Sequence, residues 1–186
     1  MQWMTHSTLA DRHAFLSASN YHWLNYTPDK LESRWMTHQA AVRGTKLHAL
    51  AHDAIKLGIK FAGPRQSLSR YVNDAIGFRM RTEQVLYYSD NCFGTADTIS
   101  FRKNLLRIHD LKTGISKVSM NQLIIYAALF CLEYGVSPYD ITTELRIYQN
   151  DEVDAYIPEP EEIKIVMNKI IEFDGLVSMF RAQQEI

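Results

Sequence analysis

The chain has 186 residues, of which 46% are hydrophobic, and this length favours one well-buried core over two domains. The N-terminus lacks a basic start followed by an apolar core, and the longest apolar stretch, LIIYAALFCL, is far short of the roughly 20 residues of a membrane span, so we expect neither targeting nor membrane association. Only Cys92 and Cys131 are present, too few for a secreted disulfide framework, so we expect a cytoplasmic protein.

The formal net charge of −1 hides a separation of charge along the chain. Residues 34–117 carry a balance of +8, whereas residues 118–186 carry −8. A basic half can contact the phosphates of a polyanion, while an acidic half serves solubility or faces away. The alternative, that the two halves interleave in space, stays open.

The first third of the chain has helical patterns. Ser19 can cap a short helix that continues through Leu24. Thr27-Pro28 opens a second helix, with proline at the first position, where its missing N–H costs nothing. This pattern continues to about Phe61, with a break near Thr37 as the alternative.

A β-rich region follows the Gly63-Pro64 break and a helix at Leu68–Phe78. Asp90-Asn91 and Lys103-Asn104 are the natural turns between its strands. The three expected strands are Glu83–Ser89, Cys92–Phe101 and Leu105–Lys112.

The last third alternates helix and strand. We expect a helix at Met120–Tyr134 that ends at Gly135, a strand at Ile141–Gln149 and a terminal helix after Pro160. Three strands followed by a helical crossover to a fourth predict a mixed sheet with helices on both faces. We therefore expect one α/β domain over residues 1–186, a three-layer α/β/α sandwich in which residues 1–81 are mainly helical and residues 82–186 form the αβ core with an acidic C-terminal helix.

Two aspartates are predicted to oppose each other on neighbouring strands. Period two places Ile108, Asp110 and Lys112 on one face of their strand. A turn centred between Lys103 and Asn104 pairs residues whose numbers sum to 207, which sets Asp97 opposite Asp110. Like charges there are destabilising, so the pair needs a shared proton or a cation between its carboxylates.

A divalent metal held by oxygen ligands is the economical choice of cation. Lys112, one pleat beyond, could then orient an attacking water and offset charge on phosphoryl oxygens. A solvated hairpin whose charged residues merely face water is the structural alternative, and it predicts no affinity for metal.

Three further side chains, His48, His52 and Glu83, carry imidazole or carboxylate groups. His48 and His52 are one helical turn apart, which could also make a zinc-type pair or two surface residues. Gly44, one turn before His48, permits close backbone approach within a helix. Glu83, with a turn centred on Asp90-Asn91, is expected to oppose residue 98 and is left out of the site unless a bulge intervenes.

Several short motifs together resemble the RecB-like branch of the PD-(D/E)XK nucleases, including its phage-encoded members. The resemblance covers roughly residues 16–126. The motifs are Leu16-Ser17-Ala18-Ser19 through Trp23-Leu24, Gly44-Thr45-Lys46-Leu47-His48, Gly94-Thr95-Ala96-Asp97, Asp110-Leu111-Lys112-Thr113-Gly114 and Gln122-x-x-x-Tyr126.

The resemblance implies a restriction-endonuclease-like fold and a role for each matched residue. His48, Asp97, Asp110 and the Leu111 carbonyl would hold Mg²⁺ or Mn²⁺, and Lys112 would be catalytic together with the two aspartates. Gln122 and Tyr126, which share a helix face, would line the DNA side. Some relatives hold an iron–sulfur cluster through four cysteines, which this chain lacks, so we expect no such cluster.

The function expected from the resemblance is a DNA exonuclease that processes ends in phage or mobile-element recombination or repair. Its partners would be single- or double-stranded DNA and, as open alternatives, a second copy of the chain or a recombination protein. An endonuclease, a flap nuclease and a DNA-binding subunit that does not cut stay open as well. The expected phosphate contacts are Arg43, Lys46, Arg79, Arg81 and Lys117.

Overall fold

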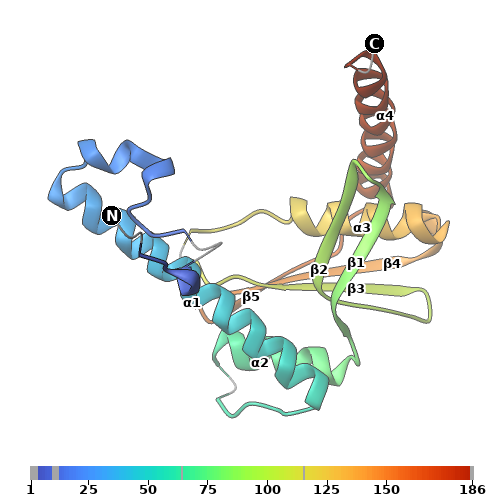
Figure 1. Ribbon diagram of the computed structural model, residues 1–186. Helices are drawn as coiled ribbons and strands as arrows, with labels where there is room; N and C mark the ends of the chain where they lie inside the picture. Colours follow the sequence, from blue (N-terminus) through green and yellow to red (C-terminus); the bar gives the residue numbers. More distant parts are fainter. Residues whose placement is uncertain (1–3, 10–12, 64, 115, 185–186) are drawn as a thin grey trace. The chain divides into compact units, whose positions relative to one another are not determined.

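The computed structural model describes residues 4–9, 13–63, 65–114 and 116–184 (Figure 1). Packing divides the chain into two compact units, residues 1–45 and 46–186, which are described separately. Helix α1 (Pro28–Leu57) supplies residues to both units. The expectation of one domain over the whole chain stays a prediction.

The first unit is helical, as predicted, but two details of its boundaries were wrong. It contains 3-10 helices η1 (Ser7–Leu9) and η2 (Ala18–Asn25) and the first part of α1. Ser17, not Ser19, caps η2, because its Oγ accepts from the backbone N–H of Asn20 at 3.3 Å. Helix α1 is unbroken at Thr37, whose hydroxyl donates back to the carbonyl of Ser33 at 2.9 Å and so satisfies its own polar group.

The second unit contains a five-stranded mixed sheet in the order β1-β2-β3-β4-β5. All neighbouring strands are antiparallel except β3 and β4, which are parallel. Helix α3 (Asn121–Tyr134) is the crossover between these two, so the α/β class and the mixed sheet are confirmed. The strands are β1 (Arg81–Ser89), β2 (Cys92–Arg102), β3 (Leu105–Leu111), β4 (Thr142–Gln149) and β5 (Glu152–Tyr156).

Strand β5 was not predicted, although its turn carries a local signal. Asn150 and Asp151 have φ values of 50° and 60°, and Lys103 and Asn104 have 51° and 57°. Two successive left-handed residues are the signature of a type I′ hairpin turn, in which Asn and Asp are favoured. The expected strand therefore continues through Asn150-Asp151 into an antiparallel edge strand.

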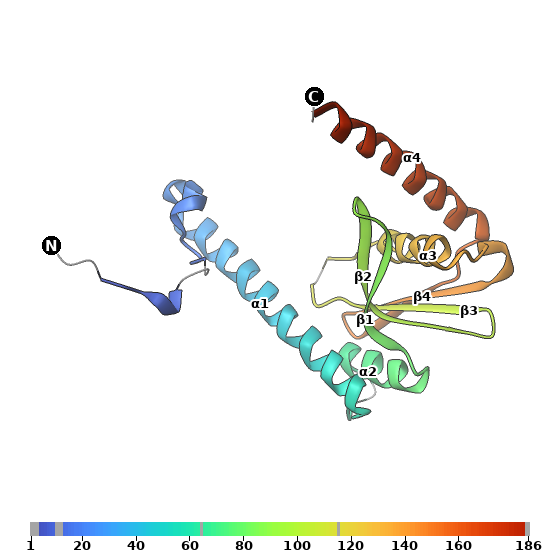
Figure 2. The ribbon, with the colours of Figure 1, turned by 45° about the vertical axis from the view of Figure 1, so that its right-hand side comes forward.

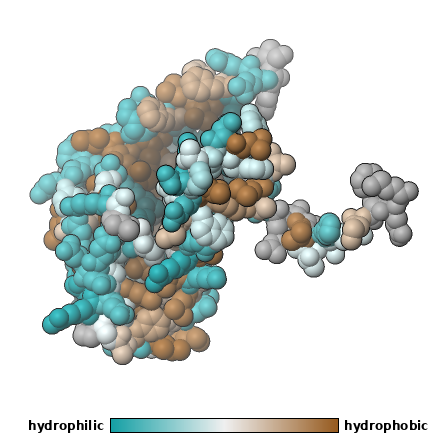
Figure 3. Space-filling view, turned by 90° about the vertical axis from the view of Figure 1, so that its left-hand side faces the viewer, coloured by the Kyte–Doolittle hydropathy of each residue, from teal (hydrophilic) through white to brown (hydrophobic). Residues whose placement is uncertain are grey.

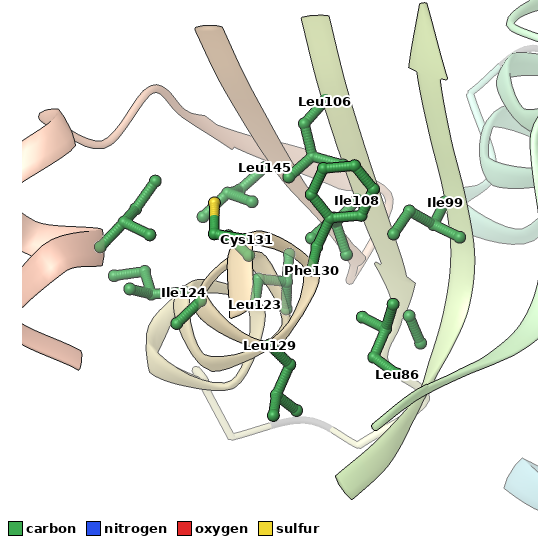
Figure 4. Close-up of a cluster of buried hydrophobic side chains, with 14 of the residues drawn as sticks. Leu86, Ile99, Leu106, Ile108, Leu123, Ile124, Leu129, Phe130, Cys131 and Leu145 are labelled. Atoms are coloured by element: carbon green, nitrogen blue, oxygen red, sulfur yellow. The ribbon is translucent and has the colours of Figure 1, made fainter. Parts of the chain in front are cut away.

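Helices cover both faces of the sheet (Figures 1 and 2). On one face, α3 packs against the strands through a core that includes Leu123, Phe130 and Ile108 (Figure 4). On the other face, α2 (Ser67–Gly77) and the end of α1 pack with Leu111 and Tyr148. Helix α1 ends at Leu57, earlier than the predicted Phe61, because the next residue, Gly58, has φ 69°.

Helix α4 (Pro160–Gln184) packs mainly on α3 and also bonds to the sheet, where Ser89 of β1 donates to its Asp174 and Tyr156 of β5 donates to its Glu162. Its first half buries Ile163, Met167 and Ile170. Its second half leaves hydrophobic side chains such as Phe173 and Phe180 about half exposed, at 53% and 51%. Figure 3 shows hydrophobic and hydrophilic side chains mixed on the face that it draws. Among the described residues, no helix is long and apolar enough to cross a membrane.

The face of the sheet under α2 buries a polar network. His109 is fully buried, and its Nδ1 lies 3.3 Å from the hydroxyl of Tyr148. The Tyr148 hydroxyl donates to Asp74 at 2.6 Å, and Asp74 also pairs with Arg146 at 3.1 Å. Arg146 in turn lies 3.0 Å from Glu144, which also pairs with Arg107 at 3.2 Å. The charges on this face are therefore balanced within the protein.

Candidate active site

The β2–β3 register agrees with the one predicted from the turn. Thr98 pairs with His109 and Ile99 with Ile108, so each pair of numbers sums to 207. Asp97 and Asp110 are the next residues along the two strands. A tight two-residue turn leaves no slack in the hairpin, and local chemistry alone therefore brings these two carboxylates to one end of the ladder.

Asp110 is buried and paired with Lys112. The residue is only 3% exposed, and Lys112 Nζ lies 3.1 Å from its Oδ1 and 3.0 Å from its Oδ2. Burial raises the pKa of Asp110, and the nearby charge of Asp97 raises it further, while Lys112 acts in the opposite direction. The shared face of residues two apart explains why Lys112 can reach this carboxylate.

A chain of hydrogen bonds links Lys112 to α3. The ammonium donates to Gln122 Oε1 at 2.9 Å, and Gln122 Nε2 donates to the hydroxyl of Tyr126 at 3.0 Å. A Cβ on Gly94 would lie 2.9 Å from Tyr126 Cε1, so only glycine fits there without moving the ring. Three motifs that are separate in sequence, those of Gly94, Lys112 and Gln122, therefore meet in space.

Asp97 is held by α1 and by the β3 backbone. Its Oδ2 lies 3.3 Å from His48 Nδ1 and accepts from the Leu111 N–H at 3.3 Å. The hydrogen bond with Asp97 raises the pKa of His48, its charge and that of Asp110 add to this, and burial acts in the opposite direction. Leu111, whose carbonyl was a predicted ligand, is itself buried and fixed beside the site.

Glu83 lies nearer the site than expected, and the expectation that it opposes residue 98 was wrong. Thr82 pairs with Thr98 and Gln84 with Ala96, which sets Glu83 opposite Asp97. The cause is an irregularity in the pairing between Tyr87 and Ser89, which shifts the register by one residue.

Glu83 also contacts the second histidine of α1. Its Oε2 lies 3.3 Å from Nδ1 of His52, one turn after His48. Glu83 has φ 50°, a conformation that costs a non-glycine residue about 1 kcal/mol, so the strand bends here. Two imidazole–carboxylate pairs therefore stand side by side, His48 with Asp97 and His52 with Glu83.

Among the described residues, none of the five basic candidates for phosphate contact forms an ion pair with these carboxylates. Lys46 and Lys117 are exposed, and neither forms an ion pair or hydrogen bond with a described residue. Arg79 and Arg81 line a cavity elsewhere in the second unit, together with Arg102, which sequence reasoning missed. Arg43 belongs to the first unit.

The donor set fits a hard divalent cation. Asp110 Oδ2 is buried and accepts no hydrogen bond of good geometry from any described residue, although Lys112 is close. Asp97 adds a second carboxylate, the ligand type that suits Mg²⁺ and Mn²⁺, and His48 adds an imidazole, which suits transition metals better than Mg²⁺. Within the described ranges, however, no three His, Cys, Asp or Glu side chains already converge as a closed metal cluster. Asp97 and Asp110 instead pair with His48 and Lys112.

No protein-family model matches the chain, and no curated protein matches it in sequence. The geometry of the site and the motif resemblance are therefore what bear on function.

Proposed function

We propose that the chain is a Mg²⁺- or Mn²⁺-dependent deoxyribonuclease of the PD-(D/E)XK superfamily, with a restriction-endonuclease-like sandwich and a RecB-like active site. The observation that carries the proposal is the ion pair of Lys112 with the buried Asp110. When the β2–β3 register is continued by one residue, Asp110 lies opposite Asp97 on the neighbouring strand. A buried carboxylate with a raised pKa beside a second carboxylate and an ammonium is an arrangement expected at reactive sites rather than on a solvated hairpin.

The motif resemblance assigns each residue a role, and the contacts of the site are compatible with it. Asp97, Asp110, His48 and the Leu111 carbonyl would hold the cation, which as a Lewis acid would polarise a phosphoryl oxygen and activate water. Lys112 would orient the attacking water and offset the negative charge that develops on the phosphate. Gln122 and Tyr126 position the ammonium of Lys112 through the hydrogen-bond chain on α3.

The proposed mode is exonucleolytic, acting on DNA ends in recombination or repair in a phage or mobile element. The motif resemblance supports this mode. An endonuclease or flap nuclease would use the same residues, and a subunit that binds without cutting would keep them without turnover. Partners in the proposal are DNA and either a second copy of the chain or a recombination protein.

The test compares end-labelled linear DNA with closed circular DNA in Mg²⁺ and in Mn²⁺. Lys112→Ala and Asp110→Asn should each lower the cleavage rate by about 100-fold or more, as loss of a transition-state-stabilising group does. Lys60→Ala and Asp140→Asn are the matched controls and should cleave as the wild type does. Both residues are exposed, and Asp140 precedes the end of β4 that pairs with Leu105, at the opposite end of β3 from Asp110.

The outcomes separate the alternatives. Metal-dependent loss of linear DNA that spares circles supports an exonuclease, and cutting of circles replaces it with an endonuclease. Absence of cleavage in either metal by a folded wild type refutes the proposed enzyme, as does cleavage that survives both site substitutions. Thermal melts of each variant distinguish lost chemistry from lost fold.

A further inference from the structure

A basic feature made of residues other than the catalytic ones lies on the same sheet. It is a cavity of about 490 Å³ beside the start of β1, the end of β2 and the end of α3. This volume falls in the range of small-ligand sites. We call it the arginine cavity, because Arg79, Arg81 and Arg102 line it together with Ser100, Phe101, Phe130 and Tyr134.

The arginines of this cavity lack internal counter-charges. Arg107 and Arg146, which lie in the same sheet, pair with Glu144 at 3.2 and 3.0 Å. In contrast, no carboxylate of a described residue lies within ion-pair distance of the three arginines of the cavity. Three unneutralised guanidinium groups around one hollow favour an anion, and a phosphate matches their fork geometry.

An aromatic row continues from the arginines. The rings of Phe101 and Phe130 are 5.0 Å apart, and those of Phe130 and Tyr134 are 4.9 Å apart. Phe130 is buried, whereas Phe101 and Tyr134 are 40% and 54% exposed. The buried ring therefore supports two exposed rings, a platform on which a flat base can stack.

Arg79 occupies a position where glycine would be more stable. It follows α2 with φ 52°, and its N–H bonds to the Ile76 carbonyl while that of Met80 bonds to Ala75. This is a left-handed helix end, where glycine is strongly preferred. The chain keeps an arginine there in spite of the conformational strain, and the side chain lines the cavity.

The cavity lies close to the catalytic residues along the same strand. Arg81 pairs with Ile99, and Asp97 is two residues before Ile99 on β2. At about 3.3 Å per strand residue, the two positions are separated by about 7 Å along β2. A nucleic-acid strand bound in the cavity therefore needs only a short length of its own backbone to reach Asp97.

We infer that the arginine cavity binds a nucleotide of single-stranded DNA, with its phosphate among the three arginines and its base stacked on Tyr134 or Phe101. The stacking platform needs an unpaired base, which is why a single strand is the proposed ligand. The inference rests on the proposed function only in taking DNA as the ligand, because binding here requires neither metal nor turnover.

The test measures binding of a fluorescein-labelled oligothymidylate by anisotropy in EDTA. Arg79→Gly is the decisive variant, since it removes the cation while relieving the backbone strain. It should leave the melting temperature unchanged or raised, yet weaken binding about tenfold and lower the slope of log affinity against log salt by about 0.7. Arg102→Ala should also weaken binding, whereas Arg65→Gly, an exposed arginine outside the cavity, should not.

A second set of probes tests the stacked base. Tyr134→Ala should weaken binding about fivefold or more, while Tyr134→Phe should bind as the wild type does. An abasic oligomer with the same charge as oligothymidylate should bind more weakly, because it lacks the bases. Thymidine monophosphate should also bind more weakly than oligothymidylate, because it lacks the neighbouring nucleotides.

The results distinguish this site from the proposed nuclease. Equal binding by wild type and Arg79→Gly, or equal binding of the abasic oligomer or of duplex DNA, overturns the inference even when cleavage is normal. Lost cleavage in Lys112→Ala with intact binding to the cavity supports both proposals. If Arg79→Gly binds more weakly than the wild type, and the wild type never cleaves DNA, the result supports the arginine cavity and refutes only the proposed nuclease.

Discussion

Acidification should destabilise this protein through one buried histidine. His109 is 0% exposed, and burial lowers its pKa to about 3, with help from the charges of Arg146 and Arg107. In the unfolded chain an imidazole has a pKa of about 6.5. Between these two values the unfolded state binds a proton that the folded state does not, so the free energy of unfolding falls as the pH is lowered.

The size of the effect follows from the two pKa values. A pH of about 5 lies about 1.5 pH units below the pKa of the unfolded imidazole. At about 1.36 kcal/mol per pH unit, protonation of the unfolded state lowers the free energy of unfolding by about 2 kcal/mol. For a chain of this length, that corresponds to a fall in melting temperature of about 4–8 °C. The contribution is absent above about pH 7.5, where both states are neutral.

The assay is thermal unfolding in EDTA at about pH 7.5 and about pH 5, for wild type and His109→Gln. The glutamine can still bond to Tyr148 but takes up no proton, so its melting temperature should fall less on acidification, by the amount given above. His13→Gln, at an exposed position, should behave as the wild type does. Equal falls in wild type and His109→Gln would refute the reasoning, because the folded protein would then admit a charged imidazole.

Three further outcomes are expected. Gly94→Ala would bring a Cβ within 2.9 Å of Tyr126 Cε1, so the ring should move and the rate of DNA cleavage should fall. The free energy of unfolding should change by under about 1 kcal/mol, and unchanged cleavage would show that the ring does not position the site. Gly135→Ala should cost about 1 kcal/mol in a denaturant melt, because φ is 63° and a Cβ meets nothing, whereas Gly77→Ala should be neutral or stabilising; the same sign for both would contradict the conformational account. Mn²⁺ at about 100 times its dissociation constant should add about 2.7 kcal/mol to wild-type stability and little to Asp110→Asn, and equal stabilisation would exclude Asp110 as a ligand.

Local chain geometry explains which parts of the candidate site could be predicted. Period two places Asp110 and Lys112 on one face, and the Lys103-Asn104 turn fixes the register that brings Asp97 alongside. Helix spacing likewise allows Gln122 and Tyr126 to bond to each other. These relations depend on residues close in sequence, so periodicity and turn chemistry suffice to derive them.

Two other features were not predicted, one because it depends on a shift in strand pairing and one because its local pattern is weak. Glu83 lies opposite Asp97 only because the pairing shifts between Tyr87 and Ser89, and the turn alone predicts a different partner. Strand β5 is short and lies at the sheet edge, where its alternating pattern is weak, and so it was missed.

The sequence by itself therefore determined the mixed α/β fold, the hairpin register and the residues of the aspartate–lysine pair. That His48 lies near Asp97 was implied only by the motif resemblance, and tertiary structure brings the two together. Tertiary structure alone decided that His52 meets Glu83 and that Arg79 and Arg81 join Arg102 at a separate cavity. The physical reason is range: hairpins and helices fix neighbours through backbone geometry, whereas α1, α2 and α3 take their places on the sheet through packing between residues far apart in the chain.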